Sequence, residues 1–242
     1  MEKMTDAPIR PSGAFAKKLE NFWYHNKFAV IVAVCVAVAA AVILSAALSR
    51  ERYDAFVLYA GDADLGLHTA SQTSDFQRIR RALTDRAADR DGNGEVSVNL
   101  QALFVMTPSQ IEAFNDTHGD DGTEVNIRLV QDNTSVLQNQ LLYSDYYILL
   151  LSEPIYRAYG ASGTDNALFA DLSAYAGEGV TFFAEDAVLL SSTAFGRLPG
   201  VKNLPADTVI CFRKLSEFAA AKEKNREIYA AAEDILREML CP

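Results

Sequence analysis

One short loop carries oxygen-bearing side chains at the spacing that a calcium ion requires. Calcium loops supply oxygen ligands at positions 1, 3 and 5, a glycine for the turn at position 6, and a backbone carbonyl at position 7. Asp89, Asp91, Asn93, Gly94 and Glu95 occupy these five positions in order. The pattern predicts a structural calcium site.

The second half of this loop departs from the calcium pattern. Position 12, which supplies a bidentate carboxylate in an EF-hand loop, is Leu100, and the residues after Glu95 alternate as in a strand rather than a helix. Aspartate, asparagine and glycine are also the residues that tight turns prefer. Two interpretations stay open: a calcium site that resembles half of an EF-hand loop, or a turn without a cation. No other cofactor is expected.

The residues that could act in catalysis do not form a recognised motif. Cys211, His118 and Arg213 are the residue types used by the sortase transpeptidases, but Thr-Val-Ile precedes this cysteine where those enzymes carry Thr-Leu-x-Thr. An apolar strand around Cys211 would also raise its pKa, which disfavours a nucleophilic thiolate. The sequence contains no metalloprotease, serine hydrolase, P-loop or dinucleotide-binding signature. We therefore expect a protein that binds and is not an enzyme.

Cys211 and Cys241 are not expected to form a disulfide. A single helix from residue 216 to 240 would be about 36 Å long. The five residues between Cys211 and the start of that helix reach back at most about 17 Å. The two thiols could meet only if the helix breaks.

Residues 28–48 form an apolar run without one charged side chain. As a helix, a run of this length covers a hydrocarbon core of roughly 30 Å. Lys17, Lys18 and Lys27 lie shortly before it, and basic residues favour the cytoplasmic side of a membrane. The expected organisation is a cytoplasmic tail over residues 1–27, a transmembrane helix over 28–48, a linker over 49–52, and an extracytoplasmic domain over 53–242.

A cleaved signal peptide is the alternative to an anchor, because Ser45, Ala46 and Ala47 are small enough for a signal peptidase site. Both the charged tail and the apolar run are longer than those of a typical signal peptide, which favours the anchor. Whether cleavage occurs after Ala47 stays open. Beyond residue 48 the chain carries 17 basic and 29 acidic side chains. Such an acidic domain is not expected to bind nucleic acid.

Strand-like and helix-like patterns alternate after the linker. Strands are predicted over residues 53–60, 95–106, 146–151, 187–191 and 207–212, and helices over 74–89, 109–114, 137–142, 153–159 and 216–240. Period alone leaves residues 124–130 undecided between strand and helix. The last helix carries Phe218, Ile228 and Ile235 on one stripe, which should pack on the sheet. The fold class predicted is α/β, with a mixed sheet and a long C-terminal helix.

The segment from residue 144 to 175 resembles part of a type 2 extracellular solute-binding protein. The resemblance rests on the strand run from Asp145 to Leu151 and on the phrase LFADLSAY that ends at Tyr175. It implies a truncated relative, because a complete binding protein of that family has two lobes. The juxtamembrane residues 18–24 are also similar to the anchors of single-span proteins of Gram-positive bacteria.

The resemblance implies a ligand site at the loop after the strand that ends at Leu151, because open α/β sheets bind ligands at the carboxyl ends of their strands. Ser152 and Glu153 would then face the ligand. In the alternative interpretation, Ser152 caps the next helix and the Glu153 carboxylate interacts favourably with its dipole.

The sequence thus predicts a single-pass protein of the cell membrane, with its N-terminus in the cytoplasm. We expect it to act as a solute-binding-like module for an unknown small molecule. The alternative is a non-catalytic structural or protein-interaction component of the cell envelope, whose partner would be an envelope protein. The two functions differ in whether a small ligand stabilises the fold.

Overall fold

The chain divides into two units, residues 1–51 and residues 52–242. The computed structural model describes residues 14–48, 53–63, 65, 74–90, 92–118, 124–160, 168–177 and 179–240.

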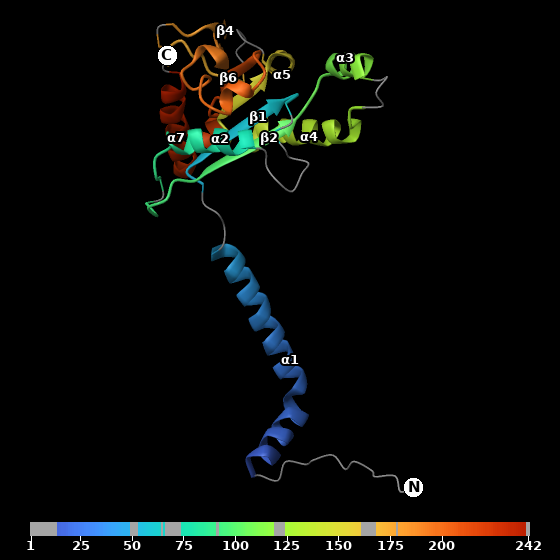
Figure 1. The fold of residues 1–242 in the computed structure, drawn as a ribbon. Coiled ribbons are helices and arrows are strands. Elements are labelled where there is room, and N and C mark those ends of the chain that lie inside the picture. The colour runs from blue at the N-terminus through green and yellow to red at the C-terminus, as the bar shows by residue number, and fades with distance from the viewer. Residues whose placement is uncertain are drawn as a thin grey trace. The chain divides into compact units, whose positions relative to one another are not determined.

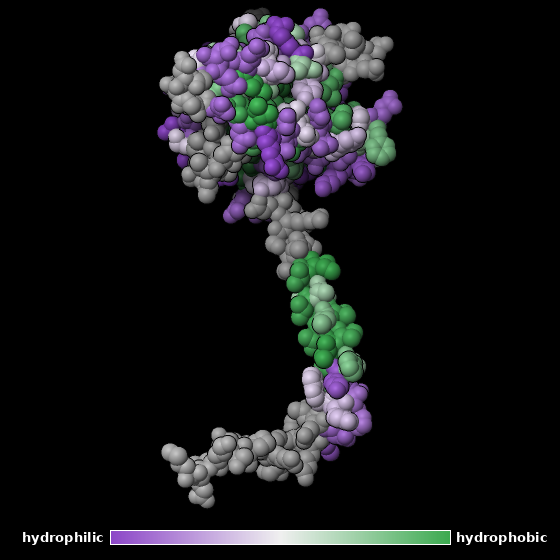
Figure 2. Space-filling view, turned by 90° about the vertical axis from the view of Figure 1, so that its right-hand side faces the viewer, coloured by the Kyte–Doolittle hydropathy of each residue, from purple (hydrophilic) through white to green (hydrophobic). Residues whose placement is uncertain are grey.

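Helix α1 (Ala14–Leu48) forms the first unit and is 35 residues long. Within it, residues 21–43 are long and apolar enough to cross a membrane, with a mean hydropathy of 2.4. Apolar side chains such as Val38 and Ile43 are exposed, and Figure 2 shows a hydrophobic surface over part of this helix, with hydrophilic residues on the side toward the N-terminus. The sequence predicted a helix from residue 28. In the structure the helix starts earlier, so Lys18 and Lys27 lie on the same helix as the apolar run.

The described part of the second unit is built on a six-stranded mixed sheet (Figure 1). The strands are β1 (Ala55–Gly61), β2 (Val98–Phe104), β3 (Ile148–Ser152), β4 (Phe182–Ala184), β5 (Ala187–Leu189) and β6 (Thr208–Phe212). Their order is β2-β1-β3-β6-β5-β4. Strand β1 pairs in parallel with both β2 and β3, whereas the β3–β6, β6–β5 and β5–β4 pairs are antiparallel. The predicted α/β class with a mixed sheet is confirmed.

Helices cover both faces of this sheet. The faces are covered by α2 (Ser74–Thr84) with α7 (Glu223–Met239) and by α4 (Ile127–Tyr143) with α5 (Glu153–Tyr159). Strand side chains alternate accordingly, since Val57 and Tyr59 pack in the α2–α7 core and Leu58 and Ala60 pack in the α4–α5 core. Coverage of both faces explains why β1 and β3 are continuous apolar runs.

Helix α3 (Pro108–His118) differs from α2, α4, α5 and α7 because it contributes no buried residue. Figure 1 shows it set apart from the sheet. Residues 124–130, which the sequence pattern could not assign to strand or helix, contain the start of α4 at Ile127. The Asn126 side chain caps this helix by accepting a hydrogen bond from the Leu129 amide at 3.1 Å. An amide oxygen at the N-cap position satisfies a backbone donor that the helix itself cannot.

The C-terminal helix was predicted as one element and is in fact two. Helix α6 (Glu217–Ala220) ends four residues after Ser216, and α7 begins at Glu223. Ile228 and Ile235 lie in the core as expected, but Phe218 is 82% exposed, so its predicted place on the buried stripe was wrong. The break between the two helices changes the direction of the stripe, and Phe218 contacts Lys222 instead, with the ammonium 6.0 Å from the ring centre.

Candidate functional site

The parallel strands place a topological switch point between β1 and β3. The connection through α2 leads from β1 to β2 on one side, and the connection through α3 and α4 leads back to β3 on the other side of β1. Open α/β sheets bind ligands in the crevice beyond the carboxyl ends of the two strands at such a point. These ends are Gly61 and Ser152. The sequence-predicted pair Ser152 and Glu153 therefore lies at the edge that the topology favours.

Ser152 does not cap the next helix, although it occupies the cap position of α5. Its side chain makes no capping hydrogen bond, it is completely buried, and its Oγ has no hydrogen-bond partner. Glu153 begins α5, and its carboxylate pairs with Arg157 at 2.7 Å. A negative charge in the first helical turn interacts favourably with the helix dipole, as the alternative interpretation expects. Of these two residues, only Ser152 has a buried side-chain oxygen without a hydrogen-bond partner.

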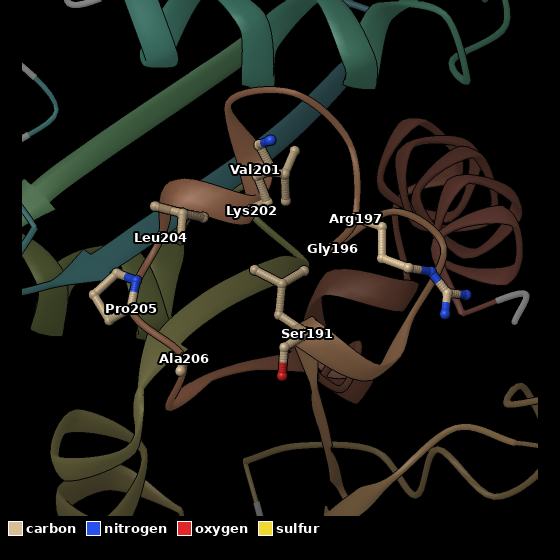
Figure 3. Close-up of a pocket in the computed structure, with 9 residues that line it drawn as sticks. Ser191, Gly196, Arg197, Val201, Lys202, Leu204, Pro205 and Ala206 are labelled. Atoms are coloured by element: carbon tan, nitrogen blue, oxygen red, sulfur yellow. The ribbon is translucent and has the colours of Figure 1, made fainter.

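A cavity of about 290 Å³ lies at the same edge of the sheet. We call it the carboxyl-edge cavity. It is lined by residues between the end of β5 and the start of β6. Because β6 is antiparallel to both β3 and β5, the end of β5 and the start of β6 lie at the same edge of the sheet as the end of β3. Figure 3 shows Leu204, Pro205 and Ala206 on one side of Ser191, and Gly196 and Arg197 on the other. The lining residues are Leu190, Ser191, Gly196, Arg197, Val201, Lys202, Leu204, Pro205 and Ala206.

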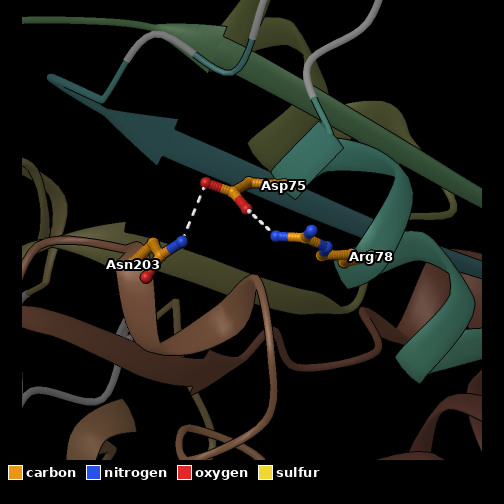
Figure 4. Close-up of polar contacts among 3 residues, drawn as sticks. All are labelled: Asp75, Arg78 and Asn203. Atoms are coloured by element: carbon orange, nitrogen blue, oxygen red, sulfur yellow. Dashed lines mark hydrogen bonds and ion pairs between the residues drawn. The ribbon is translucent and has the colours of Figure 1, made fainter.

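Polar contacts to α2 fix one wall of this cavity. The Asn203 amide donates to Asp75 Oδ2 at 2.9 Å, while Asp75 Oδ1 pairs with Arg78 at 3.3 Å (Figure 4). Gly200 has a φ of 89°, and a Cβ atom there would lie 2.6 Å from the Arg78 Cβ. Only glycine allows this backbone both its left-handed conformation and its close approach to α2.

Three buried hydroxyl-bearing side chains gather at this edge on the α2–α7 face. Tyr59 packs in that core, and strand alternation places Ser152 and Thr208 on the same face, opposite each other across the β3–β6 pair. Ser152 Oγ and Thr208 Oγ1 have no partner. The Tyr59 hydroxyl accepts from the Ala63 amide at 3.2 Å, and burial raises its pKa. The sequence did not indicate Tyr59 or Thr208, because a hydroxyl within an apolar strand gives no pattern.

The hydroxyl of Thr208, which has no hydrogen-bond partner, allows a prediction about stability, and Thr193 serves as its matched control. Thr208 and Thr193 are both completely buried, but Thr193 Oγ1 donates to the Leu190 carbonyl and accepts from the Gly196 amide. Thr208→Val should leave the stability unchanged or raise it by about 1 kcal/mol, since it removes an unsatisfied polar atom. Thr193→Val should lower it by about 1–3 kcal/mol, because it leaves a buried amide unpaired. Denaturant unfolding measures both, and equal losses would contradict this description of the site.

Acidic side chains surround the outer part of the same edge. Burial raises the pKa of Asp207, and the charges of Asp62 and Glu153 act in the same direction, although backbone hydrogen bonds from Asp207 itself and from Glu153 act in the opposite direction. The Gln110 amide reaches Asp62 Oδ2 at 3.3 Å. The carboxyl edge of the sheet therefore has carboxylates on its outer part and unpaired hydroxyls in its buried part.

The raised pKa of Asp207 predicts how stability depends on pH. The native state binds this proton more tightly than the unfolded chain, so the stabilising contribution is complete below pH 3.8 and is lost as pH rises through the native pKa. Asp207→Asn should therefore stabilise the fold at neutral pH, and the gain should shrink near about pH 4. Denaturation midpoints at the two pH values test this, and a gain independent of pH would show that the charge is not the cause.

The Asp89 loop is closed by its own backbone. The Asp89 carboxylate accepts from the amides of Gly92 and Gly94 at 2.7 and 2.8 Å, and Asn93 Oδ1 accepts from Glu95 at 2.7 Å. Both glycines have a positive φ, which a turn of this kind requires. Asp91 lies outside the described residues. This geometry suits a tight turn, and calcium binding by Asp89, Asp91, Asn93 and Glu95 stays a prediction.

Cys211 is a free, completely buried thiol in β6. Burial raises its pKa well above the ordinary value, and the charge of Asp186 acts in the same direction. A thiol in such surroundings is a poor nucleophile. Cys241 lies outside the described residues. The single helix over residues 216–240, which was expected to keep the two thiols apart, is broken after Ala220.

The phrase LFADLSAY, on which the sequence-based resemblance rests, forms a turn in the structure. Asp171 Oδ1 accepts from the Ser173 amide at 2.8 Å, and Leu172 is completely buried. The phrase thus forms an aspartate-stabilised turn anchored by an apolar side chain. No protein-family model, no curated protein and no solved structure matches this chain.

Proposed function

We propose that this chain is a single-span, membrane-anchored binding module that holds a small organic solute at the carboxyl-edge cavity. Its α/β domain would lie on the extracytoplasmic face and its N-terminus in the cytoplasm. The module would act without catalysis, as a truncated counterpart of a solute-binding protein.

The long apolar helix α1 supports the anchor. An exposed apolar surface of this length is costly in water and stable in a hydrocarbon core. The basic residues Lys18 and Lys27 precede the apolar run, which supports an N-terminus in the cytoplasm.

One observation carries the binding function, namely a largely apolar cavity at the carboxyl edge of the sheet, the same edge at which the unpaired buried hydroxyls of Ser152 and Thr208 lie. Leu190, Val201 and Leu204 supply an apolar floor. Arg197 and Lys202 also line the cavity, and neither forms an ion pair in the described part of the chain. Ligand sites combine an apolar lining with a few polar groups in this way. The ligand that fits is a small organic anion with an apolar body.

A thermal-shift screen of the full chain in detergent micelles tests this function. Sugars, amino acids, short peptides and short-chain carboxylates are the probes, and hexanoate represents the class that we favour. A ligand present at 100 times its dissociation constant adds about 2.7 kcal/mol of stability. Hexanoate should raise the melting temperature, whereas no shift with any probe would contradict the proposal.

Three variants locate the binding. Ser191→Trp fills the carboxyl-edge cavity and should abolish the shift. Arg197→Gln with Lys202→Gln removes its positive charge and should weaken binding roughly tenfold, the usual effect of losing a charged hydrogen bond. Lys214→Gln changes an exposed lysine outside the cavity and serves as the control. Equal shifts in all variants would place the ligand elsewhere.

A non-catalytic protein-interaction role in the cell envelope is the second candidate function. The observation that favours it is the exposure of large apolar side chains on α4, where Ile127, Leu142 and Tyr143 are 50%, 60% and 83% exposed. Photo-cross-linking from position 143 in intact cells tests it, with position 217 on α6 as the control. A specific adduct from position 143 together with no small-ligand shift would favour this role.

A further inference from the structure

A second cavity, of about 560 Å³, lies at the opposite edge of the sheet, and its lining includes Asp54, the residue just before β1. We call it the bipolar cavity, because its lining contains charges of both signs. Arg86 and Arg90 come from the segment after α2, and Asp234 and Glu238 come from α7. Alanines and Ile235 separate them. None of these residues lines the carboxyl-edge cavity.

The two arginines are held in place but are not neutralised. The Arg90 amide donates to Asp54 Oδ1 at 2.9 Å, and its Nη2 donates to the Tyr53 carbonyl at 3.0 Å. Its Nε is buried without an acceptor. Arg86 donates to the Ala82 carbonyl at 2.9 Å, and its guanidinium lies 5.4 Å from the centre of the Phe195 ring. A buried guanidinium N–H without an acceptor is uncommon, because its desolvation is costly.

The acidic wall is formed by the exposed side chains of Asp234 and Glu238. Asp234 and Glu238 are four residues apart on α7 and therefore share one face of the helix. Like charges at this spacing destabilise a helix slightly, so folding alone does not favour them. On the same helix Glu233 pairs with Arg237 at 2.8 Å. No ion pair joins Asp234 or Glu238 to either arginine in the described part of the chain, although all four line one cavity.

We propose that the bipolar cavity binds a small zwitterion such as a short peptide with free termini. Its anionic end would accept hydrogen bonds from Arg86 and from the unpaired Nε of Arg90, and its cationic end would donate to Asp234 and Glu238. A ligand with one charge satisfies one wall and leaves the other unpaired. The volume lies within the usual range of ligand sites, roughly 300–1,000 Å³. This site is independent of the proposed function.

Isothermal titration of the full chain in detergent micelles with three dialanine peptides tests the proposal. Unmodified dialanine carries both charges, N-acetyl-dialanine only the negative one, and dialanine amide only the positive one. Dialanine should bind, and each capped peptide should bind at least about tenfold more weakly, because each loses one charge-assisted contact. No heat with dialanine at millimolar concentration, or equal affinities for the three peptides, would overturn the proposal.

Variants of the two walls should separate the two contacts. Glu238→Gln should weaken dialanine binding roughly tenfold and leave N-acetyl-dialanine unchanged, whereas Arg86→Gln should weaken dialanine and leave dialanine amide unchanged. Glu227→Gln, an exposed change elsewhere on α7, is the matched control. Melting curves establish that each variant is folded. If Ser191→Trp abolishes dialanine binding and Glu238→Gln does not, the peptide occupies the carboxyl-edge cavity and the proposal is wrong.

Discussion

Gly196→Ala is expected to destabilise the α/β domain by at least about 3 kcal/mol, the upper end of the usual cost of overpacking. A Cβ atom at this position would lie 1.9 Å from the Leu190 carbonyl oxygen and 2.6 Å from its carbon. Both are backbone atoms, so no side-chain rotation can relieve the overlap. The turn is also fixed by the Gly196 amide, which donates to Thr193 Oγ1 at 3.0 Å. Denaturant unfolding of the full chain in detergent measures the loss.

Gly92→Ala is the matched control for this prediction. Gly92 has a φ of 69°, but a Cβ atom there would meet nothing within 4 Å. Its replacement should cost only about 1–2 kcal/mol, which is the price of a left-handed backbone for a residue with a side chain. Because Gly196 lines the carboxyl-edge cavity, its alanine variant should also lose the response to hexanoate. If Gly196→Ala were no more harmful than Gly92→Ala, the turn would not be packed as described.

Asp54→Ala is expected to cost about 3 kcal/mol or more. Asp54 is only 2% exposed and its carboxylate accepts from the amides of Arg90 and Ser97 at 2.9 and 2.8 Å. The first amide belongs to the second residue of the Asp89 loop and the second lies just after the loop, so the carboxylate ties both ends of the loop to the residue before β1. A hydrogen bond to a charged group contributes roughly 1.5–3 kcal/mol, and alanine leaves both donors unpaired. Chemical denaturation measures the effect.

Two further variants distinguish hydrogen bonding from a general effect of removing an aspartate. Asp171→Ala removes an exposed carboxylate that accepts from the Ser173 amide, and its effect on stability should be much smaller than that of Asp54→Ala, because water replaces the lost acceptor. Asp54→Asn keeps one acceptor oxygen and should give a loss between those of the two alanine variants. Similar losses for Asp54→Ala and Asp171→Ala would contradict the burial of Asp54 as the cause.

Local patterns in the sequence predicted most elements of the fold. The run from Tyr146 to Leu151 is a strand because burial on both faces requires apolar residues without interruption. The short helix after it begins where Pro154 suits a helix start. The edge strand β4 was missed, since its three residues are partly exposed and too few to show a period. The prediction of one helix over residues 216–240 with Phe218 on its buried face was wrong, because a helical stripe does not show where a helix ends.

The sequence by itself determined the apolar segment, the α/β class, and the place of Ser152 and Glu153 after a buried strand. Those features depend on residue type and on spacing along a few turns or strand positions. Only the tertiary structure decided that Ser152 has an unused hydroxyl, that Asp54 is buried, and where the two cavities lie. The contact of Asn203 with Asp75, which shapes one cavity wall, joins residues 128 positions apart. Burial and long-range contacts depend on how elements pack, and no local pattern encodes that arrangement.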